Sequence, residues 1–197
     1  MGERAEQILS SERLELEPIQ TRHAAFLFPI LHDASIHEFI PTVPPESMDQ
    51  LRTRYERLET RRSPDGSEAW LNWAIRVRAT GTYIGTTQAT VRQDGSALIA
   101  YELGAEFRGV GYAIEACQTV IDELVQGYGV GEIRAQVDTR NAPSIRLLER
   151  LSFQRIGNIH RADYFKDAWS DEYVYVRCCS VDGSRSAVPC GERPAHC

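Results

Sequence analysis

The sequence lacks a hydrophobic run that could cross a membrane. No stretch approaches the roughly 18 apolar residues that a membrane span requires. The first twelve residues, MGERAEQILSSE, contain no signal-peptide core. Gly2 suits a myristoylation motif, but position 6 is Glu rather than Ser or Thr. We therefore expect no membrane partner.

A block of lysine and arginine is also absent, and the formal net charge is −6. Proteins that bind nucleic acid directly concentrate basic residues on one surface, so we expect no nucleic-acid partner. A mildly acidic chain is better suited to a cationic substrate.

The five cysteines are an odd number and show no framework spacing. Free thiols in a reducing compartment fit this usage, so we expect a cytoplasmic protein. Cys190, His196 and Cys197 could be imagined as metal ligands, but a flexible tail is a poor preformed site. No metal is expected.

The chain is long enough for one domain with a proper core: it has 197 residues, 42% of them hydrophobic and 25% charged. It contains no internal repeat. We expect residues 1–10 to form a flexible leader and residues 11–179 the folded domain. Residues 180–197 are rich in Ser, Gly and Pro, and we expect them to be a disordered tail.

The stretch from Leu98 to Thr119 is the most informative part of the chain. An apolar, β-rich run is followed by the turn Arg108-Gly109-Val110-Gly111 and then by apolar residues at helical spacing. Such a strand–turn–helix unit presents unpaired backbone N–H groups at a helix N-terminus, which favours a phosphate-bearing ligand. Glycine at 109 and 111 lets the backbone approach that ligand closely.

Periodicity predicts the other elements. Half-buried alternation from Ser11 to Ile19 predicts a strand, and Ser47 with Gln50 three residues later is a helix-capping signature. Further strands are expected at Trp70 to Val77, Thr82 to Arg92, Glu132 to Val137, Phe153 to Ile159 and Glu172 to Cys178. Helices are expected over Gln20 to Asp33, where Pro29 should introduce a kink, and after Asn141.

The glycine turn alone allows more than one interpretation. It could be an ordinary strand-to-helix turn. The dinucleotide fingerprint G-x-G-x-x-G/A requires a small third residue, whereas position 114 is Ile. Asp138 follows the next strand, but it lies further on than that fingerprint asks.

Glu106 to Ala113 resembles the acyl-CoA loop of the GNAT superfamily of N-acetyltransferases. The run Gly109 to Ala116 is similar to that of the ribosomal-protein N-terminal acetyltransferase (Rim) type, and the strand that starts at Ser11 resembles the opening strand of that type. Glu106 replaces the usual Gln or Arg, and Ile114 replaces a frequent Thr. Both changes leave pyrophosphate binding mostly to backbone amides.

The segment from Asn141 to Phe153 resembles a second motif of the family, N-x-x-S-x-x-x-x-E-x-x-G-F, with Ser152 in place of Gly. A purely structural alternative exists: Asn is a good N-cap, and Pro143 suits the first turn of a helix. The two motifs lie 30 residues apart and are more specific together than either one is alone.

The resemblance implies a mixed α+β fold, the GNAT fold. We expect a central, mostly antiparallel, twisted sheet of about seven strands, with helices on both faces and a splayed strand pair that holds acyl-CoA. By motif match, the implied cofactor-binding residues are Leu103, Gly104, Ala105, Arg108, Gly109, Val110, Gly111, Tyr112, Ala113, Asn141 and Ser144.

The resemblance places Ser144 near the thioester sulfur, while Leu148 stands where many relatives carry a tyrosine acid. Acyl transfer requires a neutral amine, and a lysine-type ammonium near pKa 10.4 costs about 4–5 kcal/mol to deprotonate at pH 7, so a base is expected. Glu102 is the candidate base. The alternative is that Glu102 is an ordinary strand residue that faces solvent.

Two further expectations concern the site. Backbone N–H groups around Leu103 and Gly104 would stabilise the oxyanion, with a bulge at Gly104. Tyr164, with His160 and Asp163, would lie in the loop that borders the acceptor pocket, although each could be simple surface.

We therefore predict an acetyl-CoA-dependent N-acetyltransferase with acetyl-CoA as co-substrate and a primary amine as acceptor, either a protein N-terminus or a small amine. Transfer would be direct and metal-free. The alternatives are another acyl donor such as succinyl-CoA and a catalytically degenerate acyl-CoA-binding regulatory module. A homodimer is one possible assembly.

Overall fold

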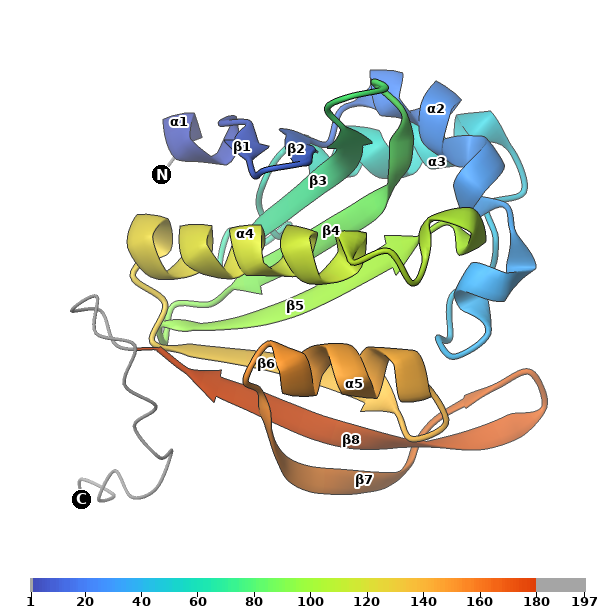
Figure 1. Cartoon of the computed structure of the whole chain (residues 1–197), viewed down its shortest axis with the longest axis vertical. Coiled ribbons are helices and arrows are strands. Elements are labelled where there is room, and N and C mark those ends of the chain that lie inside the picture. The colour runs from blue at the N-terminus through green and yellow to red at the C-terminus, as the bar shows by residue number, and fades with distance from the viewer. Residues whose placement is uncertain (1, 180–197) are drawn as a thin grey trace.

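An eight-stranded, mostly antiparallel sheet organises the chain in the computed structural model, which describes residues 2–179. The strand order is β1-β2-β3-β4-β5-β6-β8-β7, and only β5 and β6 run parallel (Figure 1). The strands are β1 (Leu9–Ser10), β2 (Leu14–Pro18), β3 (Ala69–Val77), β4 (Tyr83–Val91), β5 (Ser96–Leu103), β6 (Glu132–Asp138), β7 (Gln154–Phe165) and β8 (Ala168–Cys178). The predicted mixed α+β sheet is confirmed, with one strand more than the expected seven.

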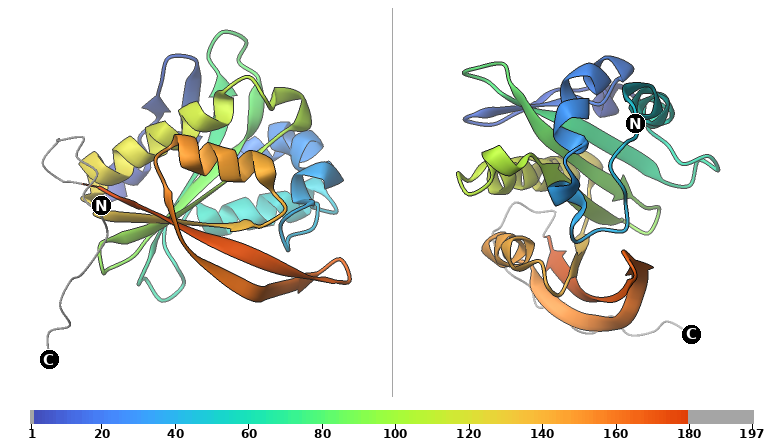
Figure 2. Two further views of the ribbon diagram at one scale, coloured as in Figure 1. Left: turned by 60° about the horizontal axis from the view of Figure 1, so that its bottom comes forward. Right: turned by 90° about the vertical axis from the view of Figure 1, so that its right-hand side faces the viewer.

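Helices cover both faces of this sheet, as expected (Figure 2). α4 (Tyr112–Tyr128) and α5 (Ala142–Arg150) lie on one face, and α2 (Ala24–Leu31) and α3 (Met48–Leu58) pack on the other. The short helices are α1 (Gly2–Ala5), η1 (Thr21–His23), η2 (Ala34–His37) and η3 (Ala105–Phe107). The helix predicted over Gln20 to Asp33 is thus divided into η1 and α2, with Pro29 inside α2.

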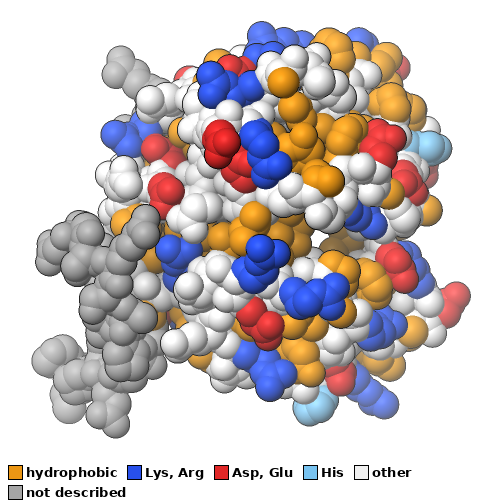
Figure 3. Space-filling model, viewed as in Figure 1, with side chains coloured by type: hydrophobic (Ala, Val, Ile, Leu, Met, Phe, Trp, Pro, Cys, Tyr) orange, Lys and Arg blue, Asp and Glu red, His pale blue; other side chains and the backbone are white. Residues whose placement is uncertain are grey.

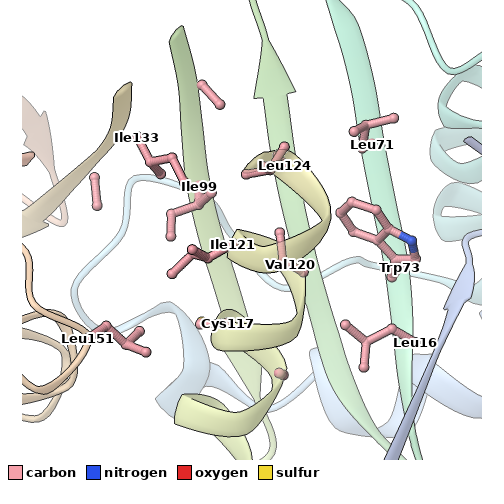
Figure 4. Close-up of a cluster of buried hydrophobic side chains, with 14 of the residues drawn as sticks. Leu16, Leu71, Trp73, Ile99, Cys117, Val120, Ile121, Leu124, Ile133 and Leu151 are labelled. Atoms are coloured by element: carbon pink, nitrogen blue, oxygen red, sulfur yellow. The ribbon is translucent and has the colours of Figure 1, made fainter. Parts of the chain in front are cut away.

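The larger core lies between α4 and the sheet, because α4 places one apolar stripe against the inward side chains of the strands (Figure 4). Cys117, Val120, Ile121 and Leu124 of α4 are almost fully buried. They meet the strand residues Leu16, Leu71, Trp73 and Ile99. A second, smaller cluster under α2 and α3 consists of Ile19, Ala24, Leu27, Leu31, Leu51, Tyr55 and Ala74.

The predicted caps are present. The Ser47 hydroxyl oxygen accepts a hydrogen bond from the Gln50 N–H at 3.1 Å, and the Asn141 side chain accepts one from the Ser144 N–H at 3.2 Å. Each satisfies one backbone donor that a helix N-terminus leaves free. α4 ends at Gly129, whose φ of 67° is the left-handed conformation that glycine adopts without strain.

The N-terminal residues differ from the flexible leader that was expected. Leu9–Ser10 form β1, which pairs antiparallel with Leu16 and Glu15 of β2. Ala5 and Leu9 are buried and belong to the larger core. A few scattered apolar residues in a mostly polar segment were too weak a signal for this contact. The predicted disordered tail, residues 180–197, lies outside the described residues.

The cysteines only partly match the expected free thiols. Cys117 is free and fully buried, and Cys179 is free and partly buried, whereas Cys178 is disulfide-bonded. In the part of the chain from residue 2 to residue 179, no helix is both long and apolar enough to traverse a bilayer.

β5 and β6 diverge, and this divergence shapes the site. Their parallel pairing covers only Ser96–Glu132, Ala97–Ile133 and Leu98–Arg134. Beyond these pairs, residues 99–103 of β5 stay paired with β4, and residues 135–138 of β6 stay paired with β8. The sheet therefore opens into a cleft, as the splayed strand pair of the expected fold requires.

The bulge expected at Gly104 is absent, because β5 pairs with β4 in unbroken register as far as Leu103. The irregularity lies instead between Ile75 and Arg76 in the β3–β4 pair. Gly85, opposite Leu103, permits the close approach of these strands: a Cβ there would lie 2.1 Å from the Glu102 carbonyl oxygen.

Gly85→Ala should therefore be strongly destabilising. A methyl group cannot fit at 2.1 Å from a backbone oxygen, so β4 and β5 would have to separate. We expect a loss of about 2–4 kcal/mol in unfolding free energy, somewhat above typical overpacking, measured by urea titration. Gly131→Ala is the control, since nothing lies within 4 Å of a Cβ at that position. Equal stability of the two variants would contradict the close approach.

Candidate active site

The glycine turn presents a row of free backbone donors at the start of α4. Gly109 and Gly111 adopt φ values of 80° and 90°, and Gly111 is the N-cap residue without a side chain to fill that role. Among the described residues, no acceptor pairs with the N–H groups of residues 109–114. Because these groups converge at the positive end of a 17-residue helix, they form a site for an anion.

The cleft between β5 and β6 leads away from this turn. In Figure 3 the surface is hollowed between the half of the molecule that carries α4 and the half that carries α5. Along β5, the residues paired with β6 come first, and the residues that are no longer paired with β6 follow them. The chain then passes through η3 into the glycine turn. A long, narrow ligand with an anionic group at one end would fit this arrangement.

Tyr101 and Ser144 bridge the cleft. The Tyr101 hydroxyl and the Ser144 hydroxyl lie 2.9 Å apart, one on β5 and the other on α5. Burial raises the pKa of Tyr101 to about 12, so this phenol stays protonated at neutral pH. The sequence reasoning selected Ser144 but treated Tyr101 only as an apolar strand residue. Tyr101 lies on the same strand face as Leu103, a predicted cofactor-binding residue, and this position could have indicated that Tyr101 belongs to the site.

Asn141 and Leu148 behave as the capping interpretation predicts. Asn141 caps α5 through its side-chain oxygen, and Leu148 is 4% exposed in the larger core. The position at which many relatives carry a tyrosine acid is therefore a packing position here, and the phenol nearest to Ser144 comes from β5 instead.

Glu102 points to the opposite face of β5 from Tyr101. Its side chain lines a cavity of about 20 Å³ beneath α3, together with Tyr55, Thr86 and other residues. The Thr86 hydroxyl donates to Glu102 at 3.4 Å. The Tyr55 hydroxyl is buried and has no hydrogen-bond partner among the described residues, while burial and then the Glu102 charge raise the pKa of Tyr55. Glu102 is half-buried rather than a fully solvent-facing strand residue.

One of the two predicted oxyanion donors is already occupied. The Gly104 N–H donates to the Ile84 carbonyl at 3.0 Å, which ties the end of β5 to β4. Leu103 is buried in the core, and Ala105 begins η3. The prediction for Gly104 is therefore wrong on this point, because without a bulge the strand keeps its ordinary ladder partner.

Arg108 turns away from the glycine turn. Its Nε donates to the Leu103 carbonyl at 3.3 Å and its Nη2 to the Ser35 carbonyl at 3.4 Å. The side chain thus holds η2 against the end of β5. Its backbone N–H donates to the Ala105 carbonyl at 3.3 Å, so the free amides of the turn begin at Gly109.

Tyr164 lies near the end of β7 rather than in a loop, because β7 and β8 are longer than expected. It is 54% exposed, and its ring packs edge-on against Trp169 at 5.3 Å. The structure places no contact between Tyr164 and either Glu102 or Ser144 within residues 2–179. The hairpin does reach the cleft side of the molecule, since Lys166 donates to the His37 carbonyl.

Carboxylates gather where β6 and β8 meet. Asp138 is 3% exposed and accepts hydrogen bonds from Arg140 and from the Ser170 hydroxyl. Glu172 is opposite Asp138 in the sheet register, and burial, Asp163 and Asp138 together raise the pKa of Glu172. His160 instead pairs with Asp171 at 3.2 Å on the surface. The end of β6 therefore carries several carboxylates, of which Asp138 is paired with Arg140.

Comparison with known proteins gives a consistent result. A family model described as "Acetyltransferase (GNAT) domain" matches residues 13–154. An uncharacterized N-acetyltransferase, p20 of Bacillus licheniformis, is 30% identical over 169 residues, which are 85% of this chain and 93% of the relative. An uncharacterized N-acetyltransferase of Bacillus subtilis, YoaA, is 26% identical over 85% of this chain and 94% of the relative.

Two solved structures share the fold. RimL, a ribosomal L7/L12 alpha-N-protein acetyltransferase in complex with coenzyme A, superposes with a TM-score of 0.78 at 18% identity, covering 89% of this chain and all of that one. Mycobacterium smegmatis RimJ in complex with CoA-disulfide has a TM-score of 0.78 at 20% identity, covering 88% of each chain.

Proposed function

Because the chain belongs to the acetyltransferase (GNAT) domain family, we propose that it transfers the acetyl group of acetyl-CoA to a primary amine by direct attack. One observation carries this proposal: the part of β5 that has left β6 carries Tyr101, which is hydrogen-bonded to Ser144, and the chain then continues through η3 to the free N–H groups of residues 109–114. The first feature suits a pyrophosphate and the second suits a thioester, which are the two ends of the reactive part of acyl-CoA.

The donor would bind through backbone atoms. The pyrophosphate accepts hydrogen bonds from the amides of residues 109–114, where Gly109 and Gly111 leave the backbone uncovered. The pantetheine arm then follows the part of β5 that is not paired with β6, toward Ser144. Side-chain donors at positions 106 and 114 are not needed for this binding mode.

In the transfer step, the amine nitrogen forms a bond with the thioester carbonyl carbon, and the C–S bond breaks. The ammonium proton passes to Glu102, directly or through a water, before or during attack. The leaving sulfur departs as a thiolate that accepts a hydrogen bond from the Ser144 hydroxyl, itself hydrogen-bonded to Tyr101, and it takes up the second proton that the nitrogen loses as the amide forms. No covalent enzyme intermediate forms.

Ser144→Ala should have a modest effect under this mechanism. A thiol with a pKa near 8.5 leaves readily without full protonation, so we expect kcat to fall by about 3-fold to 10-fold, below the usual range for a general acid. Affinity for CoA should be unchanged, and Tyr101→Phe should give a similar result. Steady-state kinetics test this. A loss of about 1,000-fold would make Ser144 an obligatory acid, and an unchanged kcat would remove it from the mechanism.

The acceptor class follows from charge and from amine chemistry. The carboxylates Glu102, Asp138 and Glu172 favour a cationic acceptor. An α-amine near pKa 8 costs only about 1–1.5 kcal/mol to deprotonate at pH 7, against about 4–5 kcal/mol for a lysine side chain. RimL is named as an enzyme that acts on a protein α-amine. We therefore favour a polypeptide N-terminus over a lysine side chain.

A thiol-release assay with acetyl-CoA tests the proposal. The panel should contain short peptides with free N-termini, the same peptides with blocked N-termini and one internal lysine, and small amines. Release that depends on a free N-terminus supports the preferred acceptor, and release with small amines alone corrects it. No release with any amine, together with no binding of CoA, would overturn the function itself.

The comparisons do not favour the two alternatives. The matching family and the most similar relatives are described as acetyltransferases rather than as succinyltransferases or binding modules. Running the same assay with succinyl-CoA separates acetyl from succinyl transfer directly.

A further inference from the structure

A segment some hundred residues before the glycine turn is fastened to it. Glu115, in the first turn of α4, accepts hydrogen bonds from the Ser11 hydroxyl at 2.7 Å, the Arg13 N–H at 2.7 Å and the Arg13 Nε at 2.6 Å. Burial tends to raise the pKa of Glu115, but these bonds outweigh it and lower that pKa, so the carboxylate stays charged. The pair thus joins the start of β2 to the start of α4.

Arg13 also contacts the residues on either side of Gly111. Its Nη1 donates to the Val110 carbonyl at 3.0 Å, and its guanidinium lies 4.7 Å from the centre of the Tyr112 ring. Two of its three nitrogens are therefore used to hold the turn, which fixes the direction of the third.

That third nitrogen, Nη2, lies next to Gly111. A Cβ on Gly111 would lie 3.2 Å from it, so Nη2 occupies the side on which glycine leaves the backbone bare. Nη2 has no hydrogen-bond partner within the described residues, and the side chain is 42% exposed. Gly111 is one of the residues whose backbone N–H groups have no acceptor within the described part of the chain.

The arginine of the turn itself, Arg108, points its side chain elsewhere. The Nε and Nη2 of Arg108 donate to the carbonyls of Leu103 and Ser35. Position 106, where the family usually has Gln or Arg, is Glu. Glu115 itself places a negative charge near the anion site, and Arg13 offsets it.

We propose that Arg13 binds the pyrophosphate of acyl-CoA through Nη2, while its Nε and Nη1 hold the glycine turn in its binding conformation. This inference rests on the proposed function and extends it to a residue outside both motifs of the family's CoA site. A guanidinium that two hydrogen bonds already hold in place loses little further conformational entropy when it binds a phosphate oxygen, which favours binding.

Arg13→Ala tests the proposal, with Arg4→Ala as a matched control. Arg4 also comes from the N-terminal segment and also pairs with a glutamate of α4, Glu123, at 3.2 Å. The two arginine side chains are 42% and 46% exposed. Arg13→Ala should weaken CoA binding by about 10-fold to 100-fold in calorimetry, the effect of one charge-assisted hydrogen bond. Arg4→Ala should stay within about 2-fold of wild type in the same titration, because Arg4 contacts no part of the turn.

A truncated donor separates an effect at the pyrophosphate from a general loss of activity. S-acetylpantetheine has no pyrophosphate, so Arg13→Ala should lower kcat/KM with acetyl-CoA while leaving kcat/KM with S-acetylpantetheine unchanged. An equal loss with both donors, or equal CoA affinity in the Arg13 and Arg4 variants, would overturn the proposal. If Arg13→Ala fails to fold, Arg13→Lys keeps the charge without the fork, and the same ratio between donors is measured. A wild-type protein that does not bind CoA would instead refute the proposed function.

Discussion

Gly109→Asp should weaken CoA binding by about 100-fold, because it places a carboxylate among the amides that would hold the pyrophosphate. Two like charges about 5 Å apart repel by about 3 kcal/mol at an effective dielectric constant of 20, which corresponds to that factor. Nothing lies within 4 Å of a Cβ at Gly109, so the new side chain does not disturb packing. Calorimetric titration with CoA measures the effect.

Gly95→Asp is the control for backbone strain. Gly95 has the same φ of 80° and the same open surroundings, but it lies in the turn between β4 and β5, at the end of the sheet away from the cleft. Asp tolerates the left-handed conformation better than most residues, so both variants should lose a similar, small amount of stability. Equal CoA affinity in the two variants would show that the glycine turn does not bind the ligand.

Local patterns predicted most of the fold. The alternation in β2, β3 and β4, the Ser47 cap and the apolar stripe of α4 each satisfy one rule within one segment, and each is present. β1 escaped prediction because two residues carry no period. The length of β7 escaped because nine of its twelve residues are exposed, so its outer half has no hydrophobic alternation to reveal a strand.

The site was harder to predict, because its contacts join segments far apart in the chain. The glycine turn and Asn141 belong to short motifs and were found. Tyr101 with Ser144 and Arg13 with Glu115 are pairs whose members are 43 and 102 residues apart. Neither Tyr101 nor Arg13 signals its role by residue type, since a strand tyrosine usually packs and a strand arginine usually faces solvent. Only the tertiary fold brings each of them next to its partner.

Glu102→Gln should cause the largest loss of turnover, because the carboxamide preserves shape but cannot accept a proton. Loss of a general base typically lowers the rate about 10²-fold to 10⁴-fold, and we expect kcat to fall within that range while CoA affinity is kept. The position supports this role: Glu102 is half-buried on the face of β5 opposite Tyr101, so a base and the leaving group would act from the two sides of one strand.

The pH dependence distinguishes a base from a structural carboxylate. As the pH rises toward the pKa of the acceptor amine, more of the amine is already neutral, so the deficit of the Gln variant should shrink steadily. A residue that only supports the cavity beneath α3 would give a deficit of constant size. Glu132→Gln, the same replacement at the far end of β6, should leave kcat unchanged at every pH. A pH–rate profile of Glu102→Gln that stays flat and near wild type would transfer the base role to a water or to the substrate itself.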